Sequence, residues 1–151
     1  MKQMRIIKHI SYRTDDNQYR KAGIILEKKI EQYDVVIIGG GAAGLTAAIY
    51  CGRARLKTLV IEKALVGGLA TYTNEIENYP GFPEGSTGLG LMELFHKQAK
   101  KFGVKFKLTD VRAVQLKGDK KVVETFRTDY ECRSVIIASG GKPRLTGAPG
   151  E

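Results

Sequence analysis

Six residues, 39–44, have the types and spacing of a nucleotide-binding turn. They read Gly-Gly-Gly-Ala-Ala-Gly and fit the pattern G-x-G-x-x-G. In such a turn the first glycine, Gly39, permits a tight bend, and Gly41 lets the backbone approach a pyrophosphate, while Gly44 lets a helix pack closely on a strand. The N-terminus of that helix offers N–H groups and a partial positive charge to phosphate oxygens. The pattern alone is weak, so its context decides what it indicates.

The residues around the turn supply this context. Residues 35–38 are a continuous β-branched run, which predicts a central parallel strand. Residues 42–54 are rich in Ala and Leu and predict a helix, and residues 57–61 predict a second strand, completing a βαβ unit. Glu62 follows where a carboxylate can accept hydrogen bonds from ribose hydroxyls. The arrangement predicts a dinucleotide site and leaves both NAD(P) and FAD open.

The segments that follow predict the rest of an α/β fold. Residues 64–90 form a long irregular loop, which is uncommon unless it is functional. The sequence then predicts a helix over 89–102 that ends at Gly103. The predicted strands, in chain order, cover residues 104–108, 111–116, 122–126, 130–132 and 134–138. We expect a parallel sheet with helices, joined to a small antiparallel three-stranded meander.

The chain divides into an extension and one domain. Its 151 residues leave room for a single domain, which we expect to span residues 33–151. Residues 1–32 form a basic N-terminal extension, and the apolar pattern in residues 18–32 predicts an amphipathic helix there. We expect no signal peptide in it. We assign no function to this extension.

Composition argues against several other classes of protein. The net charge is +9, but the basic residues are scattered and no nucleic-acid motif is present, so we expect no nucleic-acid partner. Cys51 and Cys132 form neither a C-x-x-C pair nor a metal-ligand set, and we expect no metal site and an inert Cys51. The lack of a disulfide framework favours the cytoplasm. The uncharged run of residues 35–52 is interrupted by glycines, so we expect no membrane span.

Several longer segments resemble one enzyme family. Residues 33–50 resemble the FAD-binding start of low-molecular-weight thioredoxin reductases, which are FAD-dependent pyridine nucleotide-disulfide oxidoreductases. Gly67-Gly68 and then residues 73–82, Thr-Asn-Glu-Ile-Glu-Asn-Tyr-Pro-Gly-Phe, resemble that family's stretch beneath the flavin. Residues 136–144 resemble its A-T-G strand end, and residues 149–151 resemble the P-G-E that precedes its NADPH domain. The similarity covers residues 32–151.

The resemblance implies a Rossmann-like FAD-binding fold with the FAD diphosphate over the glycine turn. Glu62 would hold the adenosine ribose, and Asn74 and Asn78 would contact the ribityl–isoalloxazine part. Loop capping by the two asparagines stays open as an alternative. The resemblance and the turn together give a set of candidate cofactor-binding residues and no catalytic residue: Gly39, Gly41, Ala42, Ala43, Gly44, Glu62, Lys63, Gly67, Gly68, Leu69, Asn74, Asn78, Val111, Ser139 and Gly140.

Three members of this set have a structural alternative or depart from the family. Val111 would lie beside the adenine or serve in ordinary strand packing. Ser139 would close over the cofactor or belong to a simple turn at a strand end, and it replaces the usual Thr while keeping the hydroxyl. Leu69 stands where the family usually has Gln, so the flavin loses a side-chain amide, which leaves the electron donor open. His96 is expected to be a solvated surface residue.

The expected fold is incomplete at its C-terminus, because the family's second glycine motif, its C-x-x-C and its C-terminal G-D segment are absent from the sequence. In the complete family enzyme, NADPH passes a hydride to FAD, and the reduced flavin reduces a disulfide that exchanges with that of thioredoxin. We expect this chain to supply only the FAD half of that relay and not to be a competent reductase alone. NADPH would act through the missing domain, and thioredoxin would be the partner of the complete enzyme.

Three alternatives remain open for function. The chain is a flavin-binding subunit completed by a separate chain, a relative with another donor or acceptor of the ferredoxin-linked or alkyl hydroperoxide reductase type, or a non-catalytic remnant. The missing return strand predicts an uncovered sheet edge, and such an edge invites association. We therefore expect a homo-oligomer or an association with a completing chain.

Overall fold

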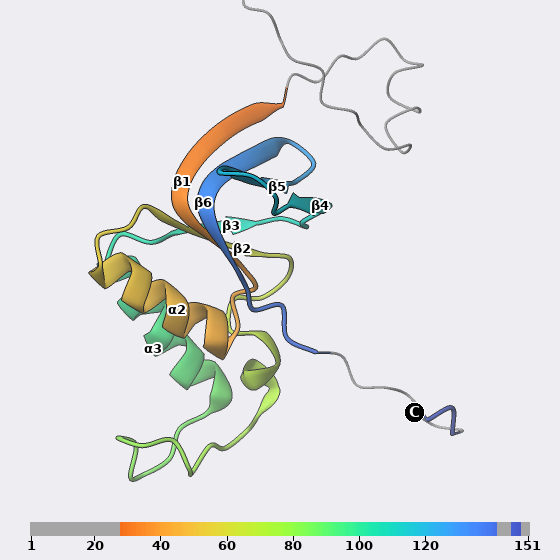
Figure 1. The fold of residues 1–151 in the computed structure, drawn as a ribbon. Coiled ribbons are helices and arrows are strands. Elements are labelled where there is room, and N and C mark those ends of the chain that lie inside the picture. Colours follow the sequence, from red (N-terminus) through yellow and green to blue (C-terminus); the bar gives the residue numbers. More distant parts are fainter. Residues whose placement is uncertain (1–27, 142–145, 149–151) are drawn as a thin grey trace, which may run out of the picture.

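The structure, a computed structural model, describes residues 28–141 and 146–148. Within this part of the chain one sheet has the strand order β3-β2-β1-β6-β5-β4, and the two α-helices lie together beside it (Figure 1). The elements are β1 Lys29–Ile38, α2 Ala42–Arg53, β2 Thr58–Glu62, the 3-10 helix η1 Gly68–Tyr72, α3 Gly88–Lys101, β3 Lys105–Leu108, β4 Ala113–Gln115, β5 Lys121–Glu124 and β6 Thr128–Ile137.

The α/β class expected from the sequence is confirmed. Strand β1 pairs in parallel with β2 on one side and with β6 on the other, and β3 extends the parallel part beyond β2. Strands β4, β5 and β6 pair antiparallel, as the expected meander does. A strand with neighbours on both sides and cover on both faces buries every side chain, which is why the β1 sequence turns continuously apolar at Val35–Ile37.

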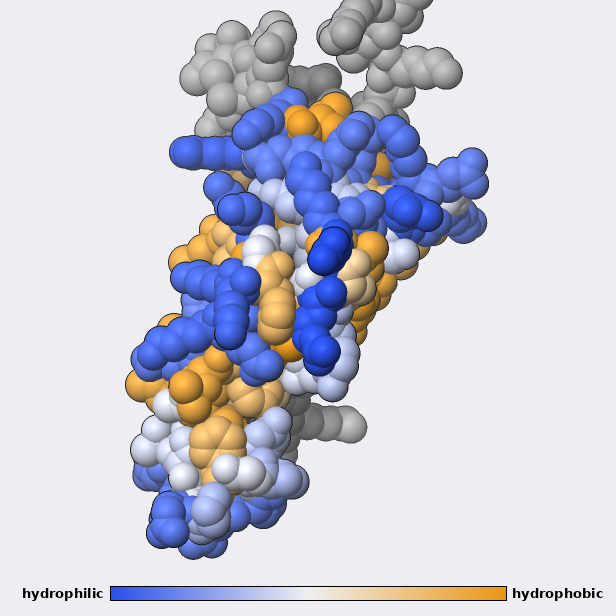
Figure 2. All heavy atoms as spheres, turned by 90° about the vertical axis from the view of Figure 1, so that its left-hand side faces the viewer, coloured by the Kyte–Doolittle hydropathy of each residue, from blue (hydrophilic) through white to orange (hydrophobic). Residues whose placement is uncertain are grey.

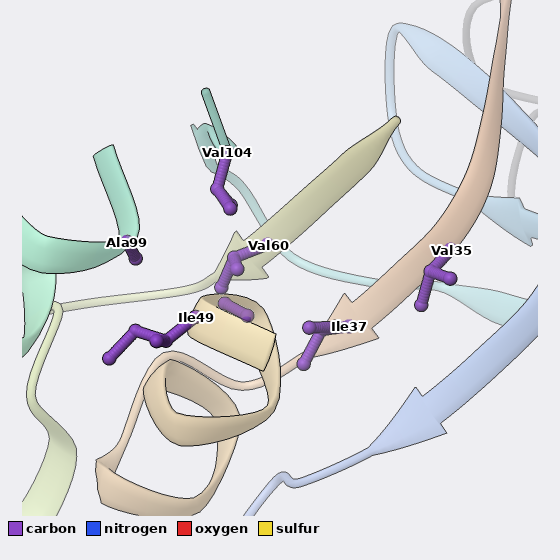
Figure 3. Packing of buried hydrophobic residues seen from close by; sticks show 7 residues of the cluster. Val35, Ile37, Ile49, Val60, Ala99 and Val104 are labelled. Atoms are coloured by element: carbon purple, nitrogen blue, oxygen red, sulfur yellow. The ribbon is translucent and has the colours of Figure 1, made fainter. Parts of the chain in front are cut away.

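Two cores use the alternate faces of the same strands. Val35, Ile37 and Val60 point toward the helices and pack with Ile49 of α2 and Ala99 of α3 (Figure 3). Side chains on the other face of β1 and β2 pack against the meander in a second cluster, which includes Val36, Leu59, Ile61, Val123, Tyr130 and Cys132. Each fully buried aliphatic side chain contributes about 1.5–3 kcal/mol relative to exposure. The two cores thus fix the strand ends from which the glycine turn starts.

The predicted helix over residues 18–32 is wrong for its last residues. Lys29–Gln32 belong to strand β1, and residues 18–27 of the prediction lie outside the described residues. The local apolar spacing suggested a helix, but this segment pairs with β6, with Lys29 opposite Thr128 and Gln32 opposite Glu131. A Lys28–Asp129 ion pair with N···O of 3.0 Å holds the start of this pairing. Pairing with a distant strand therefore overrides the local pattern.

The two short strands predicted at 130–132 and 134–138 are one strand. Strand β6 runs without interruption from Thr128 to Ile137. Its first half pairs with both β1 and β5, and among the described strands its second half pairs with β1 alone. Arg133 lies between the two predicted strands and continues the extended backbone. One long strand therefore connects the meander directly to the parallel sheet.

Candidate nucleotide-binding site

The glycine turn lies between the ends of three strands. Gly39 follows β1, and its N–H donates a hydrogen bond of 2.8 Å to the Ile61 carbonyl at the end of β2. Its φ is +104°, and a Cβ built on it would lie 2.2 Å from the carbonyl oxygen of Ala138, just after β6. Only glycine fits this combination of left-handed backbone and close approach. Gly39 thus takes the tight-bend role expected from the sequence.

Gly44 brings helix α2 directly against this turn. A Cβ on Gly44 would lie only 1.9 Å from the Gly39 carbonyl oxygen and 3.5 Å from the Ala138 side chain. The close helix-to-strand packing predicted for this position is present. No side chain caps the start of α2, where Ala42 and Ala43 are exposed. The first N–H groups of a helix have no partner within the helix, so this end can receive an anion.

A second glycine segment closes one side of the turn. The Gly67 N–H donates to the Gly40 carbonyl at 2.7 Å, and Gly67 and Gly41 form an isolated parallel bridge. A Cβ on Gly68 would lie 3.1 Å from the Gly41 Cα. A Cβ on Gly41, in contrast, would lie no closer than 3.9 Å to other protein atoms. The protein therefore leaves the space over Gly41 unfilled, as backbone approach to a ligand requires.

Glu62 ties the next strand end to the same turn. One carboxylate oxygen accepts from the Gly40 N–H at 2.8 Å, and the other accepts from the Ala64 N–H at 3.0 Å. Each carboxylate oxygen has a further lone pair that a ribose hydroxyl can use. Gly40 was absent from the candidate set, although its place within the motif could have indicated it. The ribose contact itself stays a prediction.

Several other candidates lie next to this centre. Lys63 is exposed and adjoins Glu62 in sequence. The Ser139 backbone passes Gly39 closely, since a Cβ on Gly39 would lie 3.0 Å from the Ser139 Cα. Gly140 follows with a φ of +70°, the left-handed geometry of a tight turn. The structure thus brings the strand end after β6 to the glycine turn, while the cofactor contacts of these residues stay predictions.

The remaining candidates are placed away from the turn or have no described role in it. Val111 is half-buried and packs against the core cluster on the meander side of the sheet, which agrees with its structural alternative. Asn74 and Asn78 are exposed on the long loop. Asn78 lines an open hollow of about 470 Å³ together with Thr73 and residues 75–77. Leu69, at the start of η1, is exposed to 63% of its surface.

His96 is not the solvated residue that its neighbouring lysines suggested. Its ring packs edge-on against Phe106 of β3 with centroids 4.4 Å apart, and its Nε2 is buried without a hydrogen-bond partner. Burial, and then the nearby Lys100 ammonium, lower the pKa of His96 below its ordinary value of 6.5. The side chain belongs to the packing between α3 and β3 and lies outside the candidate site.

Replacing His96 by leucine is expected to remove one source of acid instability. Because the pKa of His96 is lowered on folding, the unfolded chain binds its proton first, so stability is complete above about pH 6.5 and falls as the pH drops toward the lower, folded value. His96→Leu should lose less stability between about pH 8 and pH 5 than the unmodified chain, as measured by urea unfolding. An equal loss in both proteins contradicts this assignment.

The described cysteines and acidic residues indicate neither a reactive thiol nor a metal site. Burial raises the pKa of the Cys51 thiol and of the Cys132 thiol, which agrees with inert thiols. Across residues 28–141 and 146–148, no three His, Cys, Asp or Glu side chains come close enough to hold a metal ion. No helix in this part of the chain is long and apolar enough to cross a membrane.

The chain is similar to known proteins along most of its length. The family model described as "Pyridine nucleotide-disulphide oxidoreductase" matches residues 33–151. The chain belongs to this family. Thioredoxin reductase of Mycolicibacterium smegmatis is 49% identical over 119 residues, which are 79% of this chain and 38% of that protein. Thioredoxin reductase of Bacillus subtilis (strain 168) is 45% identical over 125 residues, or 83% and 39%.

A solved structure of a thioredoxin reductase agrees with the fold. The Lactococcus lactis thioredoxin reductase superposes with a TM-score of 0.74 at 40% identity, over 79% of this chain and 39% of that one. The resemblance to thioredoxin reductases and the Rossmann-like fold class are therefore confirmed. The chain spans less than half the length of these relatives, so activities of the whole relatives reach this chain only as proposals.

Proposed function

We propose that this chain binds FAD at the glycine turn and is the FAD domain of a thioredoxin-reductase-like oxidoreductase. One observation carries the proposal: Gly41 leaves an open backbone surface at an uncapped helix start, beside the Glu62 carboxylate. This donor set fits a dinucleotide, with N–H groups for the diphosphate and a carboxylate for a ribose. Membership in the family favours FAD over NAD(P).

The residues of the turn would bind and orient the cofactor. The first turn of α2 holds the diphosphate, Glu62 holds the adenosine ribose, and Gly67-Gly68 admit the chain that leads to the flavin. FAD, when bound, supplies electron transfer. In the complete enzyme we propose NADPH as the donor, acting through a separate domain, with thioredoxin as the disulfide partner and the cytoplasm as the location. The proposed FAD domain spans residues 33–151, with Lys29–Gln32 as an extension of its first strand.

A flavin titration tests this proposal. Adding FAD to the purified chain is expected to quench flavin fluorescence at a stoichiometry near one per chain, with little reduction of the bound flavin when NADPH is added. Only one glycine motif and no C-x-x-C occur in the sequence, so the chain has no evident route from NADPH. Dithionite serves as the control that the bound flavin can be reduced. If the chain does not bind FAD at all, the proposal is wrong.

The second half of β6 has an open edge that bears on this titration. Strand β5 begins opposite Cys132, so Ser134–Ile137 pair with β1 on one side and with no described strand on the other. Ile137 in this segment is 63% exposed. Backbone groups at such an edge are ready to pair with another strand.

We therefore predict that the chain by itself associates, or binds FAD more weakly than a longer form that covers this edge. Gel filtration with light scattering gives the association state, and FAD affinity is compared between the two forms. An isolated chain that elutes as a stable monomer with stoichiometric FAD contradicts the prediction.

Leu69 is a reason to consider an electron donor other than NADPH. Its exposed apolar side chain follows Gly67-Gly68, at the position where the resembled family carries Gln. A Gln amide that donates to the flavin would favour the electron-rich reduced form. One hydrogen bond of about 1 kcal/mol corresponds to roughly 20 mV for a two-electron couple.

Leu69→Gln is accordingly expected to raise the flavin midpoint potential by about 20 mV, measured by equilibration with reference dyes. Leu69→Met, which adds no amide, is the matched control. A lower native potential would favour a donor other than NADPH. If the Gln and Met variants have equal flavin midpoint potentials, residue 69 does not lie near the flavin.

A further inference from the structure

Basic side chains gather where helices α2 and α3 end. Gly52 of α2 packs against the turn after α3, since a Cβ on it would lie 2.8 Å from the Phe102 Cβ. Strand β3 then starts beside β2, with Lys105 opposite Leu59. This packing places five exposed residues at one end of the helix layer, and we name them the basic end: Arg53, Arg55, Lys100, Lys101 and Lys105.

Several lysines elsewhere have their charge offset by a neighbouring carboxylate. Lys28, Lys97 and Lys120 each form an ion pair with a nearby carboxylate. None of the five basic-end residues forms one within the described part of the chain. Residues 64–96, which include the loop before α3, contain four Glu and no Lys or Arg. Charge is thus separated along the molecule, and positive charge at the basic end is left without an acidic partner.

Helix capping explains only part of this cluster. Arg53 lies in the last turn of α2, and Lys100 and Lys101 lie in the last turn of α3, where cations favour the helix dipole. Arg55 and Lys105 lie beyond the helices. Arg55 has a φ of +60°, and among the described residues it is the one non-glycine residue with a positive φ. This backbone belongs to the end of α2, where the Arg55 N–H donates to the Gly52 carbonyl at 2.9 Å and the Leu56 N–H donates to the Cys51 carbonyl at 3.1 Å. Glycine or Asn is the usual residue at such a position, so capping accounts for the backbone of Arg55 but not for its basic side chain.

Two exposed apolar side chains accompany the charges. Tyr50 is 65% exposed and lies one helical turn before Arg53, on the same side of α2. Leu56 is 38% exposed and follows Arg55. Figure 2 shows that hydrophobic and hydrophilic areas alternate over the face of the molecule that carries the helices. Tyr and Arg are the residue types that most often dominate protein–protein binding energy.

We propose that the basic end, with Tyr50 and Leu56, is a docking surface for a protein that presents clustered carboxylates. A symmetric contact with a second copy would place like charges opposite each other and is disfavoured. A single-stranded nucleic acid stacks its bases on several aromatic side chains, and Tyr50 is the aromatic residue at this surface. The surface lies at the far end of α2 from the glycine turn, about 18 Å along the helix, so partner and nucleotide can bind together.

A fluorescein-labelled polyglutamate peptide that carries leucine at intervals is the probe for this surface. The triple variant Arg53→Gln, Lys101→Gln, Lys105→Gln is expected to bind it on the order of tenfold more weakly than the unmodified chain in fluorescence anisotropy. The matched control Lys117→Gln, Arg127→Gln, Arg133→Gln removes the same charge from the meander and should change the affinity less than about twofold. Tyr50→Ser should weaken binding also at high salt, where charge is screened.

Three results would overturn the proposal. These are equal weakening by the two triple variants, tighter binding of an RNA oligonucleotide that the first triple variant abolishes, and a dimer in sedimentation that this variant dissociates. Thermal unfolding confirms that each variant is folded. FAD titration of the same variants separates this proposal from the proposed cofactor site, because the triple variant should bind FAD as the unmodified chain does.

Discussion

Gly44→Ala is expected to lower the free energy of unfolding by about 3 kcal/mol or more. The added Cβ would lie 1.9 Å from the Gly39 carbonyl oxygen, which is backbone that cannot rotate away. Helix α2 must then move away from the turn. The next residue, Leu45, is fully buried and would move with the helix. Urea unfolding followed by circular dichroism measures the loss.

The matched control for this change is Gly141→Ala. No atom lies within 4 Å of a Cβ at Gly141, so its replacement should leave the free energy of unfolding within about 0.5 kcal/mol of the unmodified value. Both variants add one methyl group at a glycine near the candidate site. If Gly44→Ala is as stable as Gly141→Ala, α2 does not pack on the turn as described.

Gly41→Ala is expected to separate binding from folding. A Cβ at Gly41 would come no closer than 3.9 Å to any protein atom, and its φ of −75° suits alanine. Thermal stability should therefore stay close to that of the unmodified chain. The same methyl group would occupy the open surface where we place the FAD diphosphate. A methyl group that blocks a closely fitted ligand costs about 1–3 kcal/mol, or roughly 10–200-fold in affinity.

The measurement is a fluorescence titration with FAD on the Gly41→Ala chain and, in parallel, a thermal unfolding curve. Gly90→Ala provides a control at the start of the other helix, where the Cβ would meet only the Thr87 and Ser86 side-chain oxygens. If a well-folded Gly41→Ala chain binds FAD with unchanged affinity, the FAD diphosphate does not bind at this turn. Loss of both affinity and stability would show instead that Gly41 has a structural role.

Local sequence patterns were sufficient for the first βαβ unit. The apolar run of β1, the glycine turn and the second strand lie within one short segment, and their contacts follow from that order. The close approaches of Gly39 and Gly44 were likewise predictable, because the motif has a physical requirement at each position. The second glycine segment was known only through the resemblance, and its hydrogen bond to Gly40 came from the structure.

Long-range pairing was the part that sequence could not supply. Residues 29–32 end the segment whose apolar spacing predicted a helix over residues 18–32, yet they form a strand because they pair with β6, about a hundred positions later. The joining of two predicted strands into β6 has the same origin, since β1 supports the backbone past Arg133. The burial of His96 depends on Phe106 from another element, so the lysines beside it gave the wrong indication. The contacts of Asn74, Asn78 and Ser139 with a cofactor remain predictions.

The position of β6 in the sheet has a consequence for biosynthesis. Among the described strands β6 is synthesised last, and it lies between β1, the first of them, and the β4–β5 hairpin. Until its residues emerge, the growing chain holds two incomplete sheets that cannot join. Contacts that close such long loops form slowly, and exposed strand edges are vulnerable to mispairing in the meantime. A chain that folds during synthesis must therefore keep the edges of β1 and β5 open until β6 is available to pair with both.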